Sequence, residues 1–264
     1  MKNLLFTITL TVLAVSCNKT TAEKTENLKK DSVEIKKDSL QISVDSLIVE
    51  DSARYSKTFS AEYRQKLLTF KGLKKQVLDS LYFGELLLKE QPMQNFSKEN
   101  IQKRMTENMK NYFSESGTED EYINREFEQT WDQYSDMKIL SHTENYLTVN
   151  YNGYGFSGGA HGYGYDLNKT VDLKNQSIVH LSDIVDGSKV KWQPVLLKHV
   201  EKEILFDENI TANSNFYFDK NSITFVYNQY EIGPYAVGII EIKVPFSEIK
   251  QALKPEFKKR LNIN

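Results

Sequence analysis

The spacing of apolar residues along the chain follows two periods, one typical of strands and one typical of helices. Segments of the same kind tend to follow one another instead of alternating regularly with segments of the other kind. Strand-like alternation occupies residues 40–49, 58–70, 137–142, 146–155, 163–173, 216–218, 223–227 and 238–244. Helical spacing occupies residues 72–90, the stretch after Ser97, residues 191–205 and residues 246–253. Because most strands follow one another without a helix between them, the pattern predicts an α+β fold with a largely antiparallel sheet and packed helices.

The first residues have the pattern of a targeting segment. Lys2 precedes an apolar run over residues 4–15, which is shorter than the roughly 20 residues that a membrane-spanning helix needs. The run ends in residues 13–17, Leu-Ala-Val-Ser-Cys, which resemble the lipobox of bacterial lipoproteins. We therefore expect residues 1–16 to be a lipoprotein signal peptide and Cys17 to carry the lipid. An ordinary secretory signal is the alternative.

The single cysteine agrees with this lipid anchor. Cys17 is the only cysteine of the chain, so no disulfide can form within the mature protein. Two or three acyl chains on one cysteine exceed what stable membrane attachment requires. Asn18 follows in place of the aspartate that retains lipoproteins at an inner membrane. We expect an outer-membrane lipoprotein that faces the periplasm, with exposure at the cell surface left open.

Beyond Cys17 the composition is polar, with few large apolar residues before Val33. We expect a disordered tether over residues 17–40, an N-terminal α+β part over residues 41–136 and a C-terminal α+β part over residues 137–264. Repeated Asp-Ser dipeptides resemble acceptor sites of bacterial O-glycosylation, which makes candidates of Ser32, Ser39, Ser46 and Ser52. The alternative is a soluble stalk that grades into the first strand.

Charge and short motifs argue against several classes of function. The net charge of −2 and the lack of a basic stretch argue against nucleic-acid binding. The histidines form no Cys-His cluster and no H-E-x-x-H string, so we expect neither a metal nor a cofactor. Residues 153–158 match G-x-G-x-x-G, but the sequence predicts no helix after them that could hold a pyrophosphate.

The densest group of glycines lies in residues 151–165, where six of the chain's 12 glycines are interleaved with aromatic residues. This composition predicts a tight turn or a close approach of the backbone to another group. The centre of the run supplies the candidate binding residues Ser157, Gly158, Gly159 and His161. We expect His161 to fix the loop by hydrogen bonds, and a role as a catalytic base is the alternative.

A second candidate string, residues 227–238, contains Tyr230, Glu231 and Tyr235 just after a predicted strand. Tyrosines beside a carboxylate can form an aromatic platform with a polar rim, which suits a sugar ring or a protein loop. A buried turn with satisfied tyrosine hydroxyls is an equal alternative.

Several short motifs together resemble one domain family. They are residues 157–162, Asp172, residues 181–184, 215–217, 230–238 and 244–246, with Trp131 in the place of a recurring tryptophan. The family is the extracytoplasmic domain of unknown function seen in the ectodomain of the anti-sigma factor RsiV and in the N-terminal region of the peptidoglycan deacetylase PdaC. The resemblance implies two interlocked α+β parts and work at the cell envelope, and it does not imply catalysis.

Three hypotheses about function follow. The first is a lipid-anchored, non-catalytic binding module for a lysozyme-like protein or peptidoglycan, which contacts its ligand through the loop around His161 and the turn from Tyr230 to Tyr235. The second is a cell-wall glycan hydrolase or deacetylase with His161 and Glu231 as acid and base, which requires these side chains within about 3 Å of each other or of one bridging water. The third is an envelope scaffold, which predicts no concave pocket.

Overall fold

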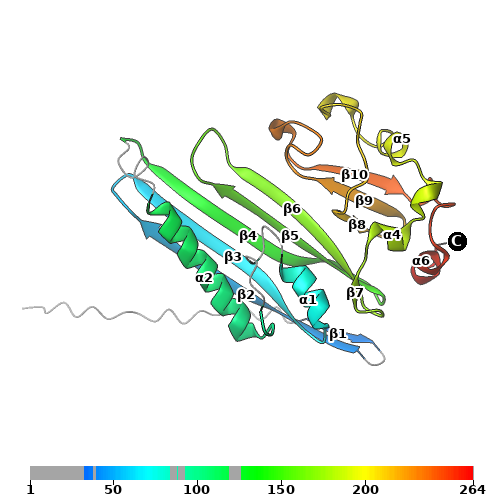
Figure 1. Cartoon of the computed structure of the whole chain (residues 1–264), viewed down its shortest axis with the longest axis horizontal. Helices are drawn as coiled ribbons and strands as arrows, with labels where there is room; N and C mark the ends of the chain where they lie inside the picture. Colours follow the sequence, from blue (N-terminus) through cyan, green and yellow to red (C-terminus); the bar gives the residue numbers. More distant parts are fainter. Residues whose placement is uncertain (1–32, 38–39, 84–87, 89–92, 119–125, 264) are drawn as a thin grey trace, which may run out of the picture. The chain divides into compact units, whose positions relative to one another are not determined.

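The computed structural model describes residues 33–37, 40–83, 88, 93–118 and 126–263. A sheet of seven strands and a sheet of three organise them (Figure 1). The large sheet has the order β1 (Val33–Lys37), β2 (Leu40–Arg54), β3 (Phe59–Lys71), β4 (Gln129–His142), β5 (Tyr146–Phe156), β6 (Tyr163–Asp172) and β7 (Ser177–Ile178). The small sheet has the order β10 (Ile240–Pro245), β9 (Ser222–Tyr227) and β8 (Phe216–Phe218).

Among the described strands, every pairing is antiparallel except that of β3 with β4. The described helices are α1 (Lys75–Tyr82), α2 (Lys98–Ser116), α4 (Leu181–Ile184), α5 (Trp192–Leu196) and α6 (Pro255–Leu261), with 3-10 turns η1 (Gly187–Lys189), η2 (Lys202–Ile204) and η3 (Tyr235–Val237). The predicted α+β class is confirmed. Ser97 begins α2 as expected, because its hydroxyl accepts a hydrogen bond from the backbone N–H of Asn100 at 3.3 Å.

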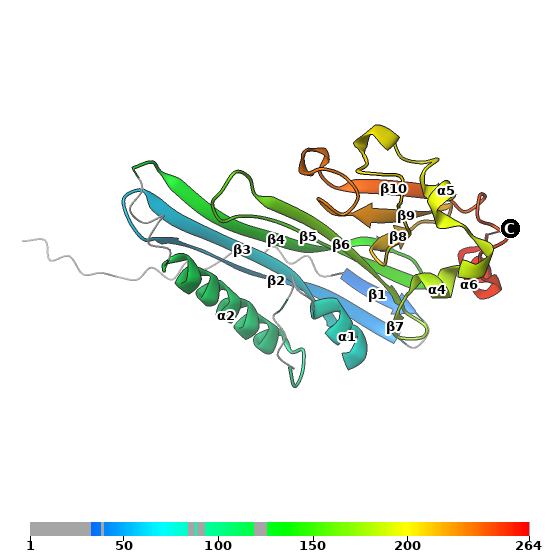
Figure 2. The same cartoon turned by 45° about the horizontal axis from the view of Figure 1, so that its top comes forward.

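Each sheet has its own apolar core. Helices α1 and α2 lie on the same side of the large sheet (Figures 1 and 2). Two methionines of α2 are part of the core there, with Met105 fully buried and Met109 partly buried. The second core lies under the small sheet, around Phe225 and Ile242. Tyr146 belongs to a strand of the large sheet but is buried in the second core, so the two parts interlock.

Two expectations about chain organisation need correction. Val33–Lys37 form β1, which pairs with β2 in the register Val33 with Val44 and Ile35 with Ile42, so the tether does not reach residue 40. The expected boundary between residues 136 and 137 falls inside β4. Because strand pairing continues across that point, the chain passes from the large sheet to the small one only after β7.

Two predicted helices are wrong. In residues 191–205, α5 ends at Leu196 and short turns follow, in which the N–H of His199 bonds the carbonyl of Leu196. The apolar residues of this stretch instead pack one by one against the second core. Residues 246–253 form turns, and the last described helix, α6, begins at Pro255, where the missing N–H of proline is tolerated.

Candidate functional site

The glycine-rich loop joins β5 to β6. Gly158 and Gly159 have φ angles of 88° and 87°, in the left-handed region that glycine adopts without strain. A Cβ on Gly159 would meet nothing within 4 Å, so the backbone conformation rather than space requires glycine there. The loop is therefore a tight turn, as its composition predicts.

The interleaved glycines and tyrosines around the loop are close cross-strand neighbours. Gly153 pairs with Tyr165, and a Cβ on Gly153 would lie 2.3 Å from the tyrosine hydroxyl oxygen. The ring of Tyr154 covers Gly162 in the same way, again with 2.3 Å between the hydroxyl oxygen and a Cβ built on the glycine. Glycine is required at both positions because aromatic rings lie on its backbone.

His161 links this loop to the turn after β9. Its Nδ1 lies 3.0 Å from the carbonyl oxygen of Gly162, and because a carbonyl only accepts, Nδ1 carries the proton. In the neutral ring Nε2 then accepts, and it lies 3.3 Å from the hydroxyl of Tyr230. The imidazole also stacks on Tyr235, with ring centroids 3.9 Å apart and planes 21° from parallel. We call His161, Tyr230 and Tyr235 the aromatic cluster.

The aromatic cluster is a surface feature. Tyr230 is 57% exposed and has a positive φ of 68°, while Tyr235 is half-buried in η3. Tyr227, at the start of the same string, is buried and donates its hydroxyl to the carbonyl of Thr211 at 2.6 Å. The two alternatives for residues 227–238, a buried turn and an aromatic platform, thus each describe part of the string. It begins buried at Tyr227 and becomes an exposed aromatic surface at Tyr230.

The remaining candidate loop and turn residues do not join the cluster. Ser157 and Gly159 are exposed beside it, and Gly158 is half-buried. The carboxylate of Glu231 is exposed and lies 3.5 Å from the side-chain nitrogen of Asn228. Among the described residues, no hydrogen bond or ion pair joins Glu231 to His161. The acid and base of the hydrolase or deacetylase hypothesis are therefore not paired directly in this geometry.

Of the proposed modification sites, Cys17, Ser32 and Ser39 lie outside the described residues. Ser46 and Ser52 lie on β2, where Ser46 is half-buried and Ser52 is exposed. In both dipeptides the aspartate carboxylate accepts a hydrogen bond from the serine N–H at 2.8 Å. The Asp-Ser dipeptides at these two positions are thus part of a strand.

Side-chain amides hold the small sheet region against β6, which the sequence analysis did not anticipate. They accept hydrogen bonds from backbone N–H groups of β6: Gln229 from Gly164 at 2.8 Å, Asn228 from Asp166 at 2.7 Å and Asn215 from Asn168 at 2.8 Å. Asn215 directly precedes β8, and Asn228 and Gln229 directly follow β9. This position next to the strands is the only sign of their role in the sequence. They place the turn that carries Tyr230 beside the loop that carries His161.

A buried ion pair ties the last helix to the large sheet. Asp172 ends β6 and forms two hydrogen bonds with Arg260 of α6, and the side chains are only 9% and 10% exposed. Burial opposes the charge on Asp172, but Arg260 and the N–H groups of Asn175 and Lys174 outweigh it and lower the pKa of the carboxyl. The guanidinium also lies over the ring of Tyr146, 4.5 Å from its centroid.

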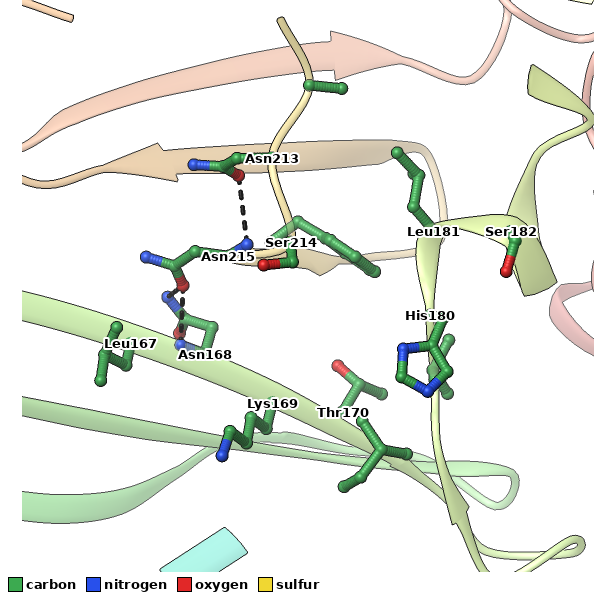
Figure 3. A pocket seen from close by; sticks show the side chains of 14 residues that line it. Leu167, Asn168, Lys169, Thr170, His180, Leu181, Ser182, Asn213, Ser214 and Asn215 are labelled. Atoms are coloured by element: carbon green, nitrogen blue, oxygen red, sulfur yellow. Dashed lines mark hydrogen bonds between the residues drawn. The ribbon is translucent and has the colours of Figure 1, made fainter. Parts of the chain in front are cut away.

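A cavity of about 540 Å³ lies between β6 and the segment that precedes β8 (Figure 3). It is lined by Leu167, Asn168, Lys169, Thr170, Ile178, Val179, His180, Leu181, Ser182, Ala212, Asn213, Ser214, Asn215 and Phe216. None of these has a carboxylate, and the ammonium of Lys169 donates to the carbonyl of Ser80 in α1. The scaffold hypothesis predicts no concave pocket, so this cavity argues against it.

Two further observations concern membranes and metals. No helix in the described part of the chain is both long and apolar enough to cross a membrane. In the same residues, no group of three or more His, Cys, Asp and Glu side chains is placed to hold a metal ion.

Comparison with known proteins matches two family models in succession. Residues 61–163 match the family described as Deacetylase PdaC, and residues 174–247 match a protein family of unknown function, DUF3298. Domains of these families are extracytoplasmic, as the resemblance implied. One region of the chain is thus similar to the PdaC family and the next to DUF3298, and the resemblance seen in the sequence is confirmed.

Solved structures show the same fold. A DUF3298 family member from Bacteroides fragilis is 24% identical, with a TM-score of 0.60 over 81% of this chain and 94% of that one. A DUF3298 family protein from Pseudomonas aeruginosa is 13% identical, with a TM-score of 0.53 over 80% and 95% of the two chains. A search of curated proteins found no match to the chain.

Proposed function

We propose that this protein is a lipid-anchored component of the cell envelope whose extracytoplasmic module binds a lysozyme-like protein or a peptidoglycan fragment without catalysing a reaction. The aromatic cluster forms the centre of the contact surface. The observation that carries the proposal is that two sequence strings far apart in the chain meet there, with His161 stacked on Tyr235 and Tyr230 largely exposed.

The physical support is preorganisation. Aromatic side chains at recognition surfaces contribute large contact area at a small cost in side-chain entropy. In the aromatic cluster the rings are already fixed by stacking and by the hydrogen bond between Tyr230 and His161, so binding has little left to order. Both nitrogens of His161 have hydrogen-bond partners, the carbonyl of Gly162 at Nδ1 and the hydroxyl of Tyr230 at Nε2. This arrangement suits a positioning role better than proton transfer.

The lipid anchor is part of this proposal because residues 13–17 resemble a lipobox that ends in Cys17. Acylation of Cys17 would hold the module at the outer membrane, facing the periplasm. Cys17→Ala is expected to move the protein from the membrane to the soluble periplasmic fraction. Continued membrane fractionation of the variant would overturn the anchor.

Calorimetric titration tests the binding function. The Cys17→Ala protein, with the rest of the chain intact, is titrated with a lysozyme of net positive charge and separately with soluble peptidoglycan fragments. We expect saturable binding to one of them, weakened at least about tenfold by Tyr235→Ala, which is the effect of losing about 1.4 kcal/mol. Leu140→Ala is the control, because Leu140 is also exposed (41%) but lies on β4. Absence of binding to both ligands would overturn the proposal.

A further inference from the structure

The outer edge of β6, on the side away from β5, is paired with a described strand only at its last two residues, where β7 lies. Over part of the remaining edge a side chain takes the place of a strand. Asn215 accepts from the N–H of Asn168 at 2.8 Å and donates to the carbonyl of Asp166 at 2.7 Å. Nearer to β7, the N–H of Val179 donates to the carbonyl of Thr170 at 2.8 Å.

Two backbone groups between these attachments have no hydrogen-bond partner in the described part of the chain. They are the carbonyl of Asn168 and the N–H of Thr170. The N–H and C=O of one strand residue point to the same side, so both groups point to the outer edge, as the bonded groups of the same two residues do. Asn168 is 5% exposed and Thr170 is 2% exposed. A ligand that bonds both groups would remove the cost of burying them unpaired.

The two groups lie at the cavity of about 540 Å³ between β6 and the segment that precedes β8. Asn168 and Thr170 line it from β6, and Ser214 lines it from the other side (Figure 3). Leu181 and Phe216 add apolar surface to its lining. Its volume is in the usual range for a ligand site, and apolar walls with a few converging polar groups are typical of such sites.

The spacing of the two unpaired groups specifies the chemistry of the ligand. In a parallel pair of strands, one residue donates its N–H to the carbonyl before its neighbour, and its C=O accepts from the N–H after that neighbour. The neighbour flanked by the two groups here is Lys169. One extended peptide residue beside Lys169 therefore satisfies both. A single trans amide does not, because its N–H and C=O point in opposite directions.

We propose that this cavity binds an extended peptide segment, which adds a short parallel strand to the edge of β6 between Asn215 and Val179. The proposal goes beyond the proposed function and does not depend on it. The peptide residue beside Lys169 places its side chain on the same face of the sheet as that lysine. The ammonium of Lys169 is half-buried and bonds the carbonyl of Ser80, and the cavity lining has no carboxylate. An acidic or neutral side chain therefore fits better there than a basic one.

Blocked tripeptides test the inference. Acetyl-Val-X-Val-amide, in which X is glutamate, threonine or lysine, is titrated calorimetrically into the Cys17→Ala protein. A copy of the glutamate peptide that is N-methylated at all three residues has no N–H to donate to Asn168. Ser214→Phe introduces a ring at the cavity wall, and Ser214→Ala is its matched control. Tyr235→Ala tests whether the aromatic cluster is involved, and circular dichroism establishes that each variant is folded.

We expect saturable binding of the glutamate peptide, at least about fivefold tighter than that of the lysine peptide. N-methylation and Ser214→Phe should each weaken binding at least about tenfold, whereas Ser214→Ala and Tyr235→Ala should change it less than about twofold. Amide hydrogen exchange at Thr170 should slow when the peptide is bound.

Three results would overturn the inference and leave the proposed function standing. They are no binding of any tripeptide, equal binding of the N-methylated copy, and exchange at Thr170 that the bound peptide does not change. Peptide binding that is abolished by Tyr235→Ala but unaffected by Ser214→Phe would place the peptide on the aromatic cluster and would also overturn it.

Discussion

The imidazole of His161 and the ring of Tyr235 are stacked with their centroids 3.9 Å apart. His161 belongs to the loop between β5 and β6 of the large sheet, and Tyr235 to η3, which follows the small sheet. The contact therefore joins the two interlocked parts of the fold. Loops and turns are usually more mobile than the strands they connect, and this contact holds one of each in a fixed surface.

The stack predicts an energetic coupling between its two residues. His161→Ala and Tyr235→Ala should together destabilise the protein less than the sum of the single changes, with a coupling of about 0.5–1.5 kcal/mol. Chemical denaturation of the four proteins in the double-mutant cycle measures it. Pairing His161→Ala with Leu140→Ala is the control, for which we expect additivity. Additivity in the His161 and Tyr235 cycle would mean that the stack contributes nothing.

Gly159 is expected to be required for its backbone conformation. Gly159→Ala should destabilise the protein by roughly 1–2 kcal/mol, because alanine is strained at a φ of 87°. Gly187→Ala is a matched control, since a Cβ there also meets nothing within 4 Å but φ is not positive. We expect that control to change stability by less than about 0.5 kcal/mol. Equal effects of the two changes in thermal denaturation would contradict the argument.

Asn215 is expected to protect the edge of β6. Its Oδ1 accepts from the N–H of Asn168, and its Nδ2 donates to the carbonyl of Asp166 at 2.7 Å. Asn215→Ala should cost about 1–3 kcal/mol, because it leaves two partly buried backbone groups without partners. Amide hydrogen exchange should accelerate at Asn168, whereas that of Gly164, which is held by Gln229, should change less. Asn209→Ala at an exposed site serves as the control.

The ion pair of Asp172 and Arg260 predicts a pH-dependent stability. Breaking it by Arg260→Met should cost about 3–5 kcal/mol near neutral pH, because a buried carboxylate is left unpaired. The folded-state pKa of Asp172 is lowered, so the pair's contribution is complete above the ordinary carboxyl pKa of about 4 and is lost as pH falls through the lowered value.

Urea denaturation of the parent and of Arg260→Met at several pH values checks this prediction. The difference in unfolding free energy should shrink below about pH 4. Lys75→Gln, which breaks the exposed pair with Asp79, should cost about 0.3–0.5 kcal/mol. A difference for Arg260→Met that stays constant down to pH 2 would contradict the assignment.

Much of the fold could be read from local patterns. The strands around Phe59–Lys71 and Tyr146–Phe156 follow from alternation, and the start of α2 follows from Ser97. The predicted helices over residues 191–205 and 246–253 failed because their apolar residues serve a core whose shape is set by the small sheet. β1 was missed because a strand of five residues is stabilised by its pairing with β2 more than by its own sequence.

The sequence alone determined which residues of the candidate site are unusual, because dense glycine and repeated tyrosine are local properties of the chain. It thereby singled out His161, Tyr230 and Tyr235. Only the tertiary structure decided that these three touch and that, among the described residues, no hydrogen bond or ion pair joins Glu231 to His161. The reason is that such contacts depend on strand register and on the amide side chains that dock the small sheet against β6, and neither has a local signature.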